Sequence, residues 1–136
     1  MALLFSPAPG EVLWCNFEAP FSTQFHPPEM TKKRRVVVLS PRNRSRVQDT
    51  IVVVPLSTQP PAICEPYHYQ LVAQYPFLHN TKKIWVKGNM VRHVSVKRLS
   101  PFYRANIATA RCLTAQDLVG ARRAAAASIG VSLVRR

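Results

Sequence analysis

The sequence predicts a mainly β protein (β with α), built as a small, strongly bent sheet or barrel that ends in one helix. Five or six short apolar runs, many rich in β-branched residues, lie within the first hundred residues, and proline-marked loops separate them. The segment from 114 to 130 differs, because it lacks proline, is rich in alanine and carries apolar residues at helical spacing. We therefore expect one domain over 1–136, with a β-barrel core over 9–100 and a helix over 114–130.

The strands follow from short apolar patterns. Large side chains alternate over 10–18, after Gly10. Two valine-rich runs, 34–40 and 50–57, are too short for helices and predict interior strands joined by a basic turn. Residues 67–73 alternate again, and 83–99 predict one or two more strands with a turn or kink at Gly88 and Asn89.

The closing helix has recognisable ends. Thr114, followed three residues later by Asp117, resembles an N-cap arrangement with an acid in the first turn. Gly130 is suited to the C-terminal end. The residues at helical spacings between them are Leu118, Val119, Arg122, Ala125 and Ile129.

The charge balance points to an anionic partner. The formal net charge is +13, from 19 lysines and arginines against 6 acids, and residues 1–30 contain no lysine or arginine. A field of this size attracts polyanions, either nucleic acid or an acidic protein. A basic surface that serves only solubility is the alternative.

Several classes of protein are disfavoured. Cys15, Cys64 and Cys112 are isolated, which argues against a disulfide framework or a zinc site, and a Cys64–His68 pair would lack two further ligands. We therefore expect no metal and no cofactor. No catalytic triad, P-loop, GxGxxG or HExxH pattern occurs. The apolar stretches predict neither a membrane span nor a secretory signal, so the expected location is cytoplasmic.

Four segments and the closing helix carry a resemblance to a known family. The four segments are, in order, PGEVLWCNF, KKRRVVVLSP, TIVVVPLST and WVKGNMVRHVSVKRL. The helix segment that follows them is LTAQDLVGARRAAAASIG. Together they resemble the MazF/PemK/Kid family of type II toxin–antitoxin endoribonucleases. The resemblance implies an SH3-like, PemK-type β-barrel with a C-terminal helix, usually a homodimer. It also implies metal-independent, sequence-specific cleavage of single-stranded RNA such as mRNA, which inhibits growth, and neutralisation by an acidic antitoxin whose complex with the toxin binds DNA.

The resemblance also assigns candidate catalytic residues. In this family the 2′-hydroxyl attacks the adjacent phosphate and leaves a 2′,3′-cyclic phosphate, which requires a base, an acid and a cation at the phosphorane. Arg34 matches the catalytic arginine, whose guanidinium fork suits phosphate oxygens. Ser57 matches a hydroxyl residue at the phosphate and Glu29 a loop acid. Lys87 and Asn89 stand where some members carry an arginine and an aspartate.

Two departures leave alternatives open. Arg35 replaces the proline expected after the catalytic arginine, so either Arg34 or Arg35 could hold that role. Asn89 cannot exchange a proton, and His93 or His26 could compensate. Arg34 could instead only anchor its strand, and Ser57 could only cap one.

The remaining cations and aromatic residues predict a nucleic-acid surface. Basic side chains contact phosphate without reading sequence, while aromatic rings stack on bases. Three rival hypotheses remain for the function. They are a non-catalytic nucleic-acid binder, a gyrase-directed toxin of the same fold and a basic domain associated with the ribosome or another ribonucleoprotein. The predicted RNA-binding residues are Lys32, Lys33, Arg35, Thr58, Arg92, Arg42 and Arg44, with Arg46 as a further phosphate contact and Trp14, Trp85, Tyr67 and Phe77 as stacking candidates, at least two of which we expect in the core.

Overall fold

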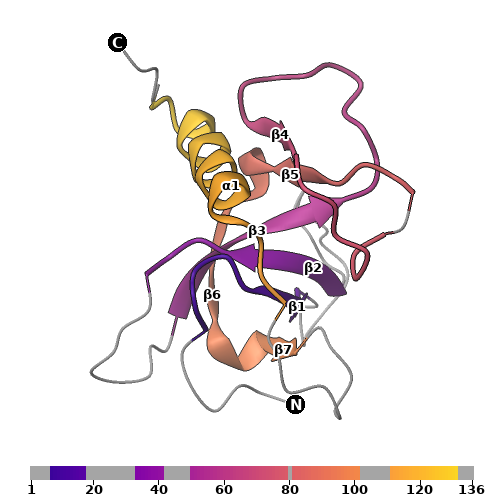
Figure 1. The fold of residues 1–136 in the computed structure, drawn as a ribbon. Helices are drawn as coiled ribbons and strands as arrows, with labels where there is room; N and C mark the ends of the chain where they lie inside the picture. Colours follow the sequence, from indigo (N-terminus) through magenta and orange to yellow (C-terminus); the bar gives the residue numbers. More distant parts are fainter. Residues whose placement is uncertain (1–6, 18–32, 42–49, 80, 102–110, 132–136) are drawn as a thin grey trace, which may run out of the picture.

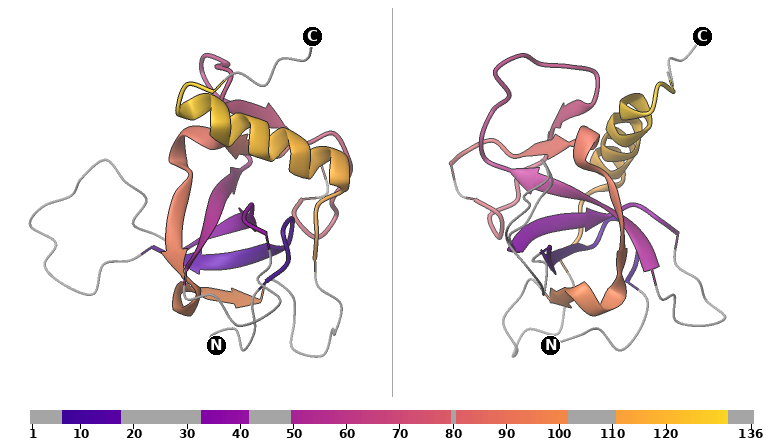
Figure 2. Two further views of the ribbon diagram at one scale, coloured as in Figure 1. Left: turned by 90° about the vertical axis from the view of Figure 1, so that its left-hand side faces the viewer. Right: turned by 180° about the vertical axis from the view of Figure 1, so that it is seen from behind.

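The computed structural model describes residues 7–17, 33–41, 50–79, 81–101 and 111–131. An antiparallel sheet forms most of this part, and one helix, α1, lies at one end of it, opposite β7 (Figures 1 and 2). The mainly β class with a C-terminal helix is thus confirmed. The elements are β1 (Val12–Asn16), β2 (Lys33–Val38), β3 (Thr50–Ser57), β4 (His68–Gln70), β5 (Trp85–Lys87), the 3-10 helix η1 (Gly88–Met90), β6 (Arg92–Ser95), the 3-10 helix η2 (Val96–Arg98), β7 (Leu99–Pro101) and α1 (Ala115–Ser128).

The sheet is bent around β3. Its strand order is β4-β5-β3-β2-β1-β7, and β6 also pairs with β3. β5 pairs with one end of β3, at Leu56 and Ser57, whereas β6 pairs with the other end, at residues 50–53. Among the described strands no ladder joins β6 to β7, so the sheet stays open, and the chain itself links these strands through η2. The predicted barrel is therefore a bent, open sheet.

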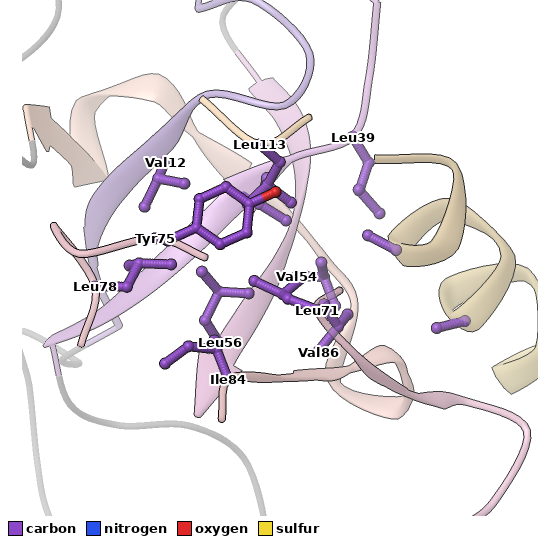
Figure 3. Close-up of a cluster of buried hydrophobic side chains, with 13 residues drawn as sticks. Val12, Leu39, Val54, Leu56, Leu71, Tyr75, Leu78, Ile84, Val86 and Leu113 are labelled. Carbon is purple, nitrogen blue, oxygen red and sulfur yellow. The ribbon is translucent and has the colours of Figure 1, made fainter. Parts of the chain in front are cut away.

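Both faces of the central strands are buried. Side chains alternate along a strand, so Val36 and Val38 of β2 enter one core while Val37 enters the other. The first core also contains Leu13 of β1 and Leu99 of β7. The second core lies between the sheet, α1 and the residues Leu71, Tyr75, Leu78 and Ile84, and Figure 3 shows its side chains. This two-sided burial explains why β2 and β3 each contain three consecutive valines.

The helix packs through small residues on its buried face. Thr114 is the N-cap, and its hydroxyl accepts the Asp117 N–H at 3.2 Å. Gly130 follows the helix with a φ of 89°, which glycine adopts without strain. The apolar residues at helical spacings do not all face the core, because Val119 and Ile129 are 46% and 76% exposed. The buried face instead consists of Asp117, Ala121 and Ala124, since small side chains let the helix backbone approach the rest of the fold.

Asp117 ties the helix to the segment that follows β4. Its fully buried carboxylate accepts hydrogen bonds from the hydroxyls of Tyr69 (2.7 Å) and Tyr75 (2.6 Å) and from the backbone N–H groups of Val72 (2.9 Å) and Ala73 (3.1 Å). Burial acts to raise the pKa of Asp117, but these four hydrogen bonds outweigh it and lower the pKa below its ordinary value. The sequence predicted only a helix-capping acid at this position.

Candidate functional site

A cavity of about 490 Å³ opens where β2, β3, β4, β5 and η1 meet. Its wall combines cationic, polar and apolar side chains. That combination suits a ligand with a charged group attached to a flat, partly apolar body. The lining residues are Arg34, Pro55, Leu56, Ser57, Gln59, Pro61, Ala62, Ile63, His68, Lys87, Asn89 and Met90.

Strand pairing puts three of the polar lining residues on one face. Ser57 of β3 pairs directly with Trp85 of β5, and His68 of β4 pairs directly with Lys87 of β5. Directly paired residues project to the same side of a sheet, and Trp85 and Lys87 are two residues apart on one strand. Ser57, Lys87 and His68 therefore share the face opposite to the buried Val86.

β2 contributes Arg34 to the same face. The observed β2–β3 register pairs Val36 with Pro55, and continuing it by two residues would set Arg34 across from Ser57. Arg34 is exposed and lines the cavity. The cavity is thus assembled from adjacent strands that lie far apart in the sequence.

Arg35 lies on the other face of β2. Its guanidinium donates a hydrogen bond of 2.8 Å to the backbone carbonyl of Leu78. Burial lowers the pKa of Arg35, and the side chain does not line the cavity. Alternation along β2 therefore brings Arg34 to the cavity and directs Arg35 to the side of the second core.

Lys87 and Asn89 flank a close contact between η1 and α1. Gly88 is buried, and its N–H donates to the carbonyl of Tyr67 at 2.8 Å. A Cβ at Gly88 would lie only 2.5 Å from the backbone of Ala124 in α1, so a side chain is excluded there. The half-buried Lys87 has its pKa lowered by burial, which Cys64 partly opposes. Asn89 is exposed at the cavity.

Sequence reasoning missed the role of His68 in this cavity. It considered this residue only in a metal pair with Cys64. Within the described residues, no group of three His, Cys, Asp or Glu side chains could hold a metal ion. The β4–β5 register is the information that places His68 beside Lys87, and the pattern of residues 67–73 predicted a strand without its neighbour.

The other predicted binding residues lie elsewhere or outside the described part. Lys33 places its Nζ 5.4 Å from the Trp14 ring centre, and Arg92 lies 5.1 Å above the Phe17 ring. His93 is exposed on β6, and neither it nor Thr58 lines the cavity. The four stacking candidates Trp14, Trp85, Tyr67 and Phe77 are all half-buried, and Phe77 packs against the second core. The predictions outside the described residues concern Glu29, Lys32, Arg42, Arg44, Arg46 and His26.

Comparison with known proteins agrees with the fold and with the order of the motifs. Residues 8–124 match the family described as PemK-like, MazF-like toxin of type II toxin–antitoxin system. The chain belongs to this family. Its sequence is 32% identical to that of the uncharacterized protein YifN of Escherichia coli (strain K12) over an alignment of 152 positions. This alignment covers 98% of this chain and 99% of that protein. It is also 31% identical to an uncharacterized protein of Haemophilus influenzae over 107 residues, 71% of each chain.

Several solved structures share the fold. MazF from Deinococcus radiodurans superposes with a TM-score of 0.63 at 20% identity, over 93% of this chain and 99% of that one. An endoribonuclease from a mycobacterial species, in complex with its cognate antitoxin, superposes with a TM-score of 0.60 at 16% identity, over 95% and 100% of the two chains. Among the described residues of this chain, no helix is both long and apolar enough to cross a membrane.

Proposed function

We propose that this PemK-like chain is an endoribonuclease that cleaves single-stranded RNA at the cavity between β2, β3, β4 and β5. One observation carries the proposal. The cavity collects Arg34, Ser57, Lys87 and Asn89, which come from β2, β3, β5 and η1 and which are catalytic candidates by the family resemblance. A cavity of about 490 Å³ is also large enough for a nucleotide-sized group.

The lining residues suit a cleavage in which RNA supplies its own nucleophile. The 2′-oxygen forms a bond to phosphorus, the bond from phosphorus to the 5′-oxygen breaks, and a 2′,3′-cyclic phosphate and a 5′-hydroxyl result. In this proposal the guanidinium of Arg34 binds the charged phosphorane oxygens, which it can contact through two N–H groups. The Ser57 hydroxyl donates a further hydrogen bond to the phosphate.

Proton transfer requires a donor and an acceptor. We assign the proton for the leaving 5′-oxygen to Lys87, because an amine whose pKa is lowered by burial gives up its proton more readily than an exposed lysine does. Asn89 orients the substrate through hydrogen bonds and carries no proton. We assign the 2′ proton to the carboxylate of Glu29, the loop acid of the family resemblance, which lies outside the described residues.

The proposed partners follow from the charge of the chain. A net charge of +13 favours an acidic antitoxin segment that competes with RNA for the cationic cavity. The fold neighbours include a mycobacterial endoribonuclease in complex with its cognate antitoxin and MazE–MazF of Deinococcus radiodurans. For this chain we propose an acidic antitoxin as partner and DNA binding by the toxin–antitoxin complex. We also propose a homodimeric state, a cytoplasmic location and a single-domain arrangement.

The test is cleavage of a varied set of single-stranded RNAs in buffer with EDTA, with the product ends mapped. Arg34→Ala should lower kcat by about 10²–10³-fold, the usual effect of removing one donor to a developing oxyanion. Arg34→Lys should restore only part of the activity because it keeps the charge but loses the guanidinium fork. Arg123→Ala is the matched control, since Arg123 is an exposed arginine of α1 outside the cavity lining.

The results also separate the proposal from its rival. Asn89 favours a second candidate function, RNA binding without cleavage, because an amide cannot exchange a proton as an aspartate does. If the folded wild type binds these RNAs and leaves their length unchanged, the nuclease proposal is wrong and the binding function stands. DNA damage in cells without RNA loss would instead indicate a gyrase-directed toxin.

A further inference from the structure

His68 is a cavity-lining side chain without a part in the mechanism above. It sits at the start of β4, beside Lys87 of β5, on the face shared with Ser57. Of the two histidines expected to compensate for Asn89, His93 is exposed outside the lining and His26 lies outside the described residues. His68 is therefore the only described imidazole that lines the cavity.

The turn that precedes β4 holds the imidazole of His68 in one orientation. The N–H of His68 donates to the carbonyl of Glu65 at 2.9 Å, which closes a turn with Pro66 at its second position. In the opposite direction, the N–H of Glu65 donates to Nδ1 of the His68 ring at 3.0 Å. The ring of Tyr67 packs edge-on against the same imidazole, with 4.6 Å between ring centres. These contacts hold both the backbone of the turn and the imidazole ring of His68 in place.

This hydrogen bond determines which ring nitrogen carries the proton. Nδ1 accepts the Glu65 N–H, so it must present a lone pair, and the neutral ring carries its proton on Nε2. A doubly protonated ring would set two N–H groups against each other at this position. Among the described residues, Nε2 has no hydrogen-bond partner, and its N–H is available to a ligand in the cavity.

We propose that His68 is a fixed, neutral hydrogen-bond donor that binds a non-bridging phosphate oxygen of the RNA through Nε2–H, beside Lys87 and across the cavity from Arg34. The inference rests on the proposed RNA substrate but assigns His68 no proton transfer. To act as a base, His68 would need a lone pair on Nε2, and to act as an acid it would need a second ring proton. Both states put a proton on Nδ1, which the Glu65 N–H opposes. The described groups next to the imidazole are Lys87, Glu65 and Tyr67, and Arg34 lines the same cavity.

Three substitutions separate the donor from the alternatives. His68→Gln places an amide N–H near the position of Nε2–H, so it should retain kcat/KM within about fivefold and keep the pH–rate profile of the wild type. His68→Asn offers an oxygen to the Glu65 N–H but does not reach the cavity, and His68→Ala removes both groups. Both should lower kcat/KM by about 10²-fold, the effect of one lost oxyanion donor. His93→Ala is the control on an exposed histidine and should match the wild type.

Each other pattern overturns the inference. If His68→Asn matches the wild type while His68→Gln does not, the ring acts only by holding the turn. If His68→Gln is as impaired as His68→Ala and loses one limb of the pH profile, His68 transfers a proton. If all three variants match the wild type, the side chain has no role at the phosphate. Circular dichroism and urea unfolding of each variant exclude loss of fold as the cause.

A second measurement does not depend on cleavage. Nitrogen-15 NMR of the histidine rings should show an unprotonated Nδ1 in His68 of the free protein. Adding a 2′,3′-cyclic nucleotide, or an RNA with 2′-deoxyribose at the scissile position, should shift the Nε2–H signal of His68. A wild type that cuts no RNA but shows this shift would refute the nuclease proposal alone. An active wild type in which the signal does not move, or in which Nδ1 carries the proton, would refute the role of His68 alone.

Discussion

Replacing the buried Asp117 should cost a large part of the stability of the fold. Its carboxylate is fully buried and accepts four hydrogen bonds, so Asp117→Ala leaves four donors without their acceptor. The Tyr75 hydroxyl still contacts Thr114, and water can reach the backbone of the exposed Val72. That leaves the Tyr69 hydroxyl and the Ala73 N–H as donors with no alternative partner.

The expected magnitude follows from those two donors. A stranded buried donor costs about 1–3 kcal/mol, so Asp117→Ala should lower the free energy of unfolding by about 4 kcal/mol. Domains of this size are stable by about 5–15 kcal/mol in total. Tyr69→Phe is the matched control, because it removes one donor and leaves the carboxylate with three, and it should cost about 1 kcal/mol.

Urea unfolding followed by circular dichroism gives the free energy of unfolding of both variants. The slope of this free energy against urea concentration should be the same in the variants and the wild type. A loss below about 1 kcal/mol for Asp117→Ala would refute the reasoning, since it would mean that water or other groups satisfy every donor.

The stability of the wild type at acid pH gives a second test of Asp117. Because the folded-state pKa of Asp117 is lowered, its contribution to stability is complete above the ordinary value of 3.8 and is lost as the pH falls below it towards the folded pKa. Asp117→Asn should lack this component.

Two further predictions concern packing and thiol chemistry. Gly88→Ala should cost about 1–3 kcal/mol in urea unfolding, because a Cβ there meets the backbone of Ala124 at 2.5 Å, and an unchanged midpoint would contradict the close packing of η1 on α1. Cys15 is fully buried, and burial raises its pKa to about 11 despite the opposing charges of two nearby arginines. A thiol reagent near neutral pH should therefore label the exposed Cys64 and Cys112 in the native protein and Cys15 only after denaturation, and equally fast labelling of all three would show that the first core is open.

Local features of the fold could be predicted from sequence because they depend on neighbouring residues. The valine run of β3 was predicted at its observed bounds, since β-branched residues bounded by turn residues favour an extended backbone. Thr114 and Gly130 marked the ends of α1, because capping and left-handed backbone are local preferences. The buried face of α1 was not predictable, because alanine and a hydrogen-bonded aspartate carry little hydrophobic signal. Whether the sheet closes into a barrel or stays open was not predictable either, since it depends on pairing between distant strands.

The sequence by itself determined the mainly β class, the order of the strands and helix, the strongly cationic charge and the family to which the chain belongs, because patterning, composition and ordered motifs are written along the chain. Only the tertiary structure decided that Arg34 and not Arg35 reaches the cavity, that His68 stands beside Lys87, and that Asp117 is buried under two tyrosine hydroxyls. Alternation along a strand separates its residues into two faces. Which face meets the cavity is set by long-range register, and no local pattern contains that register.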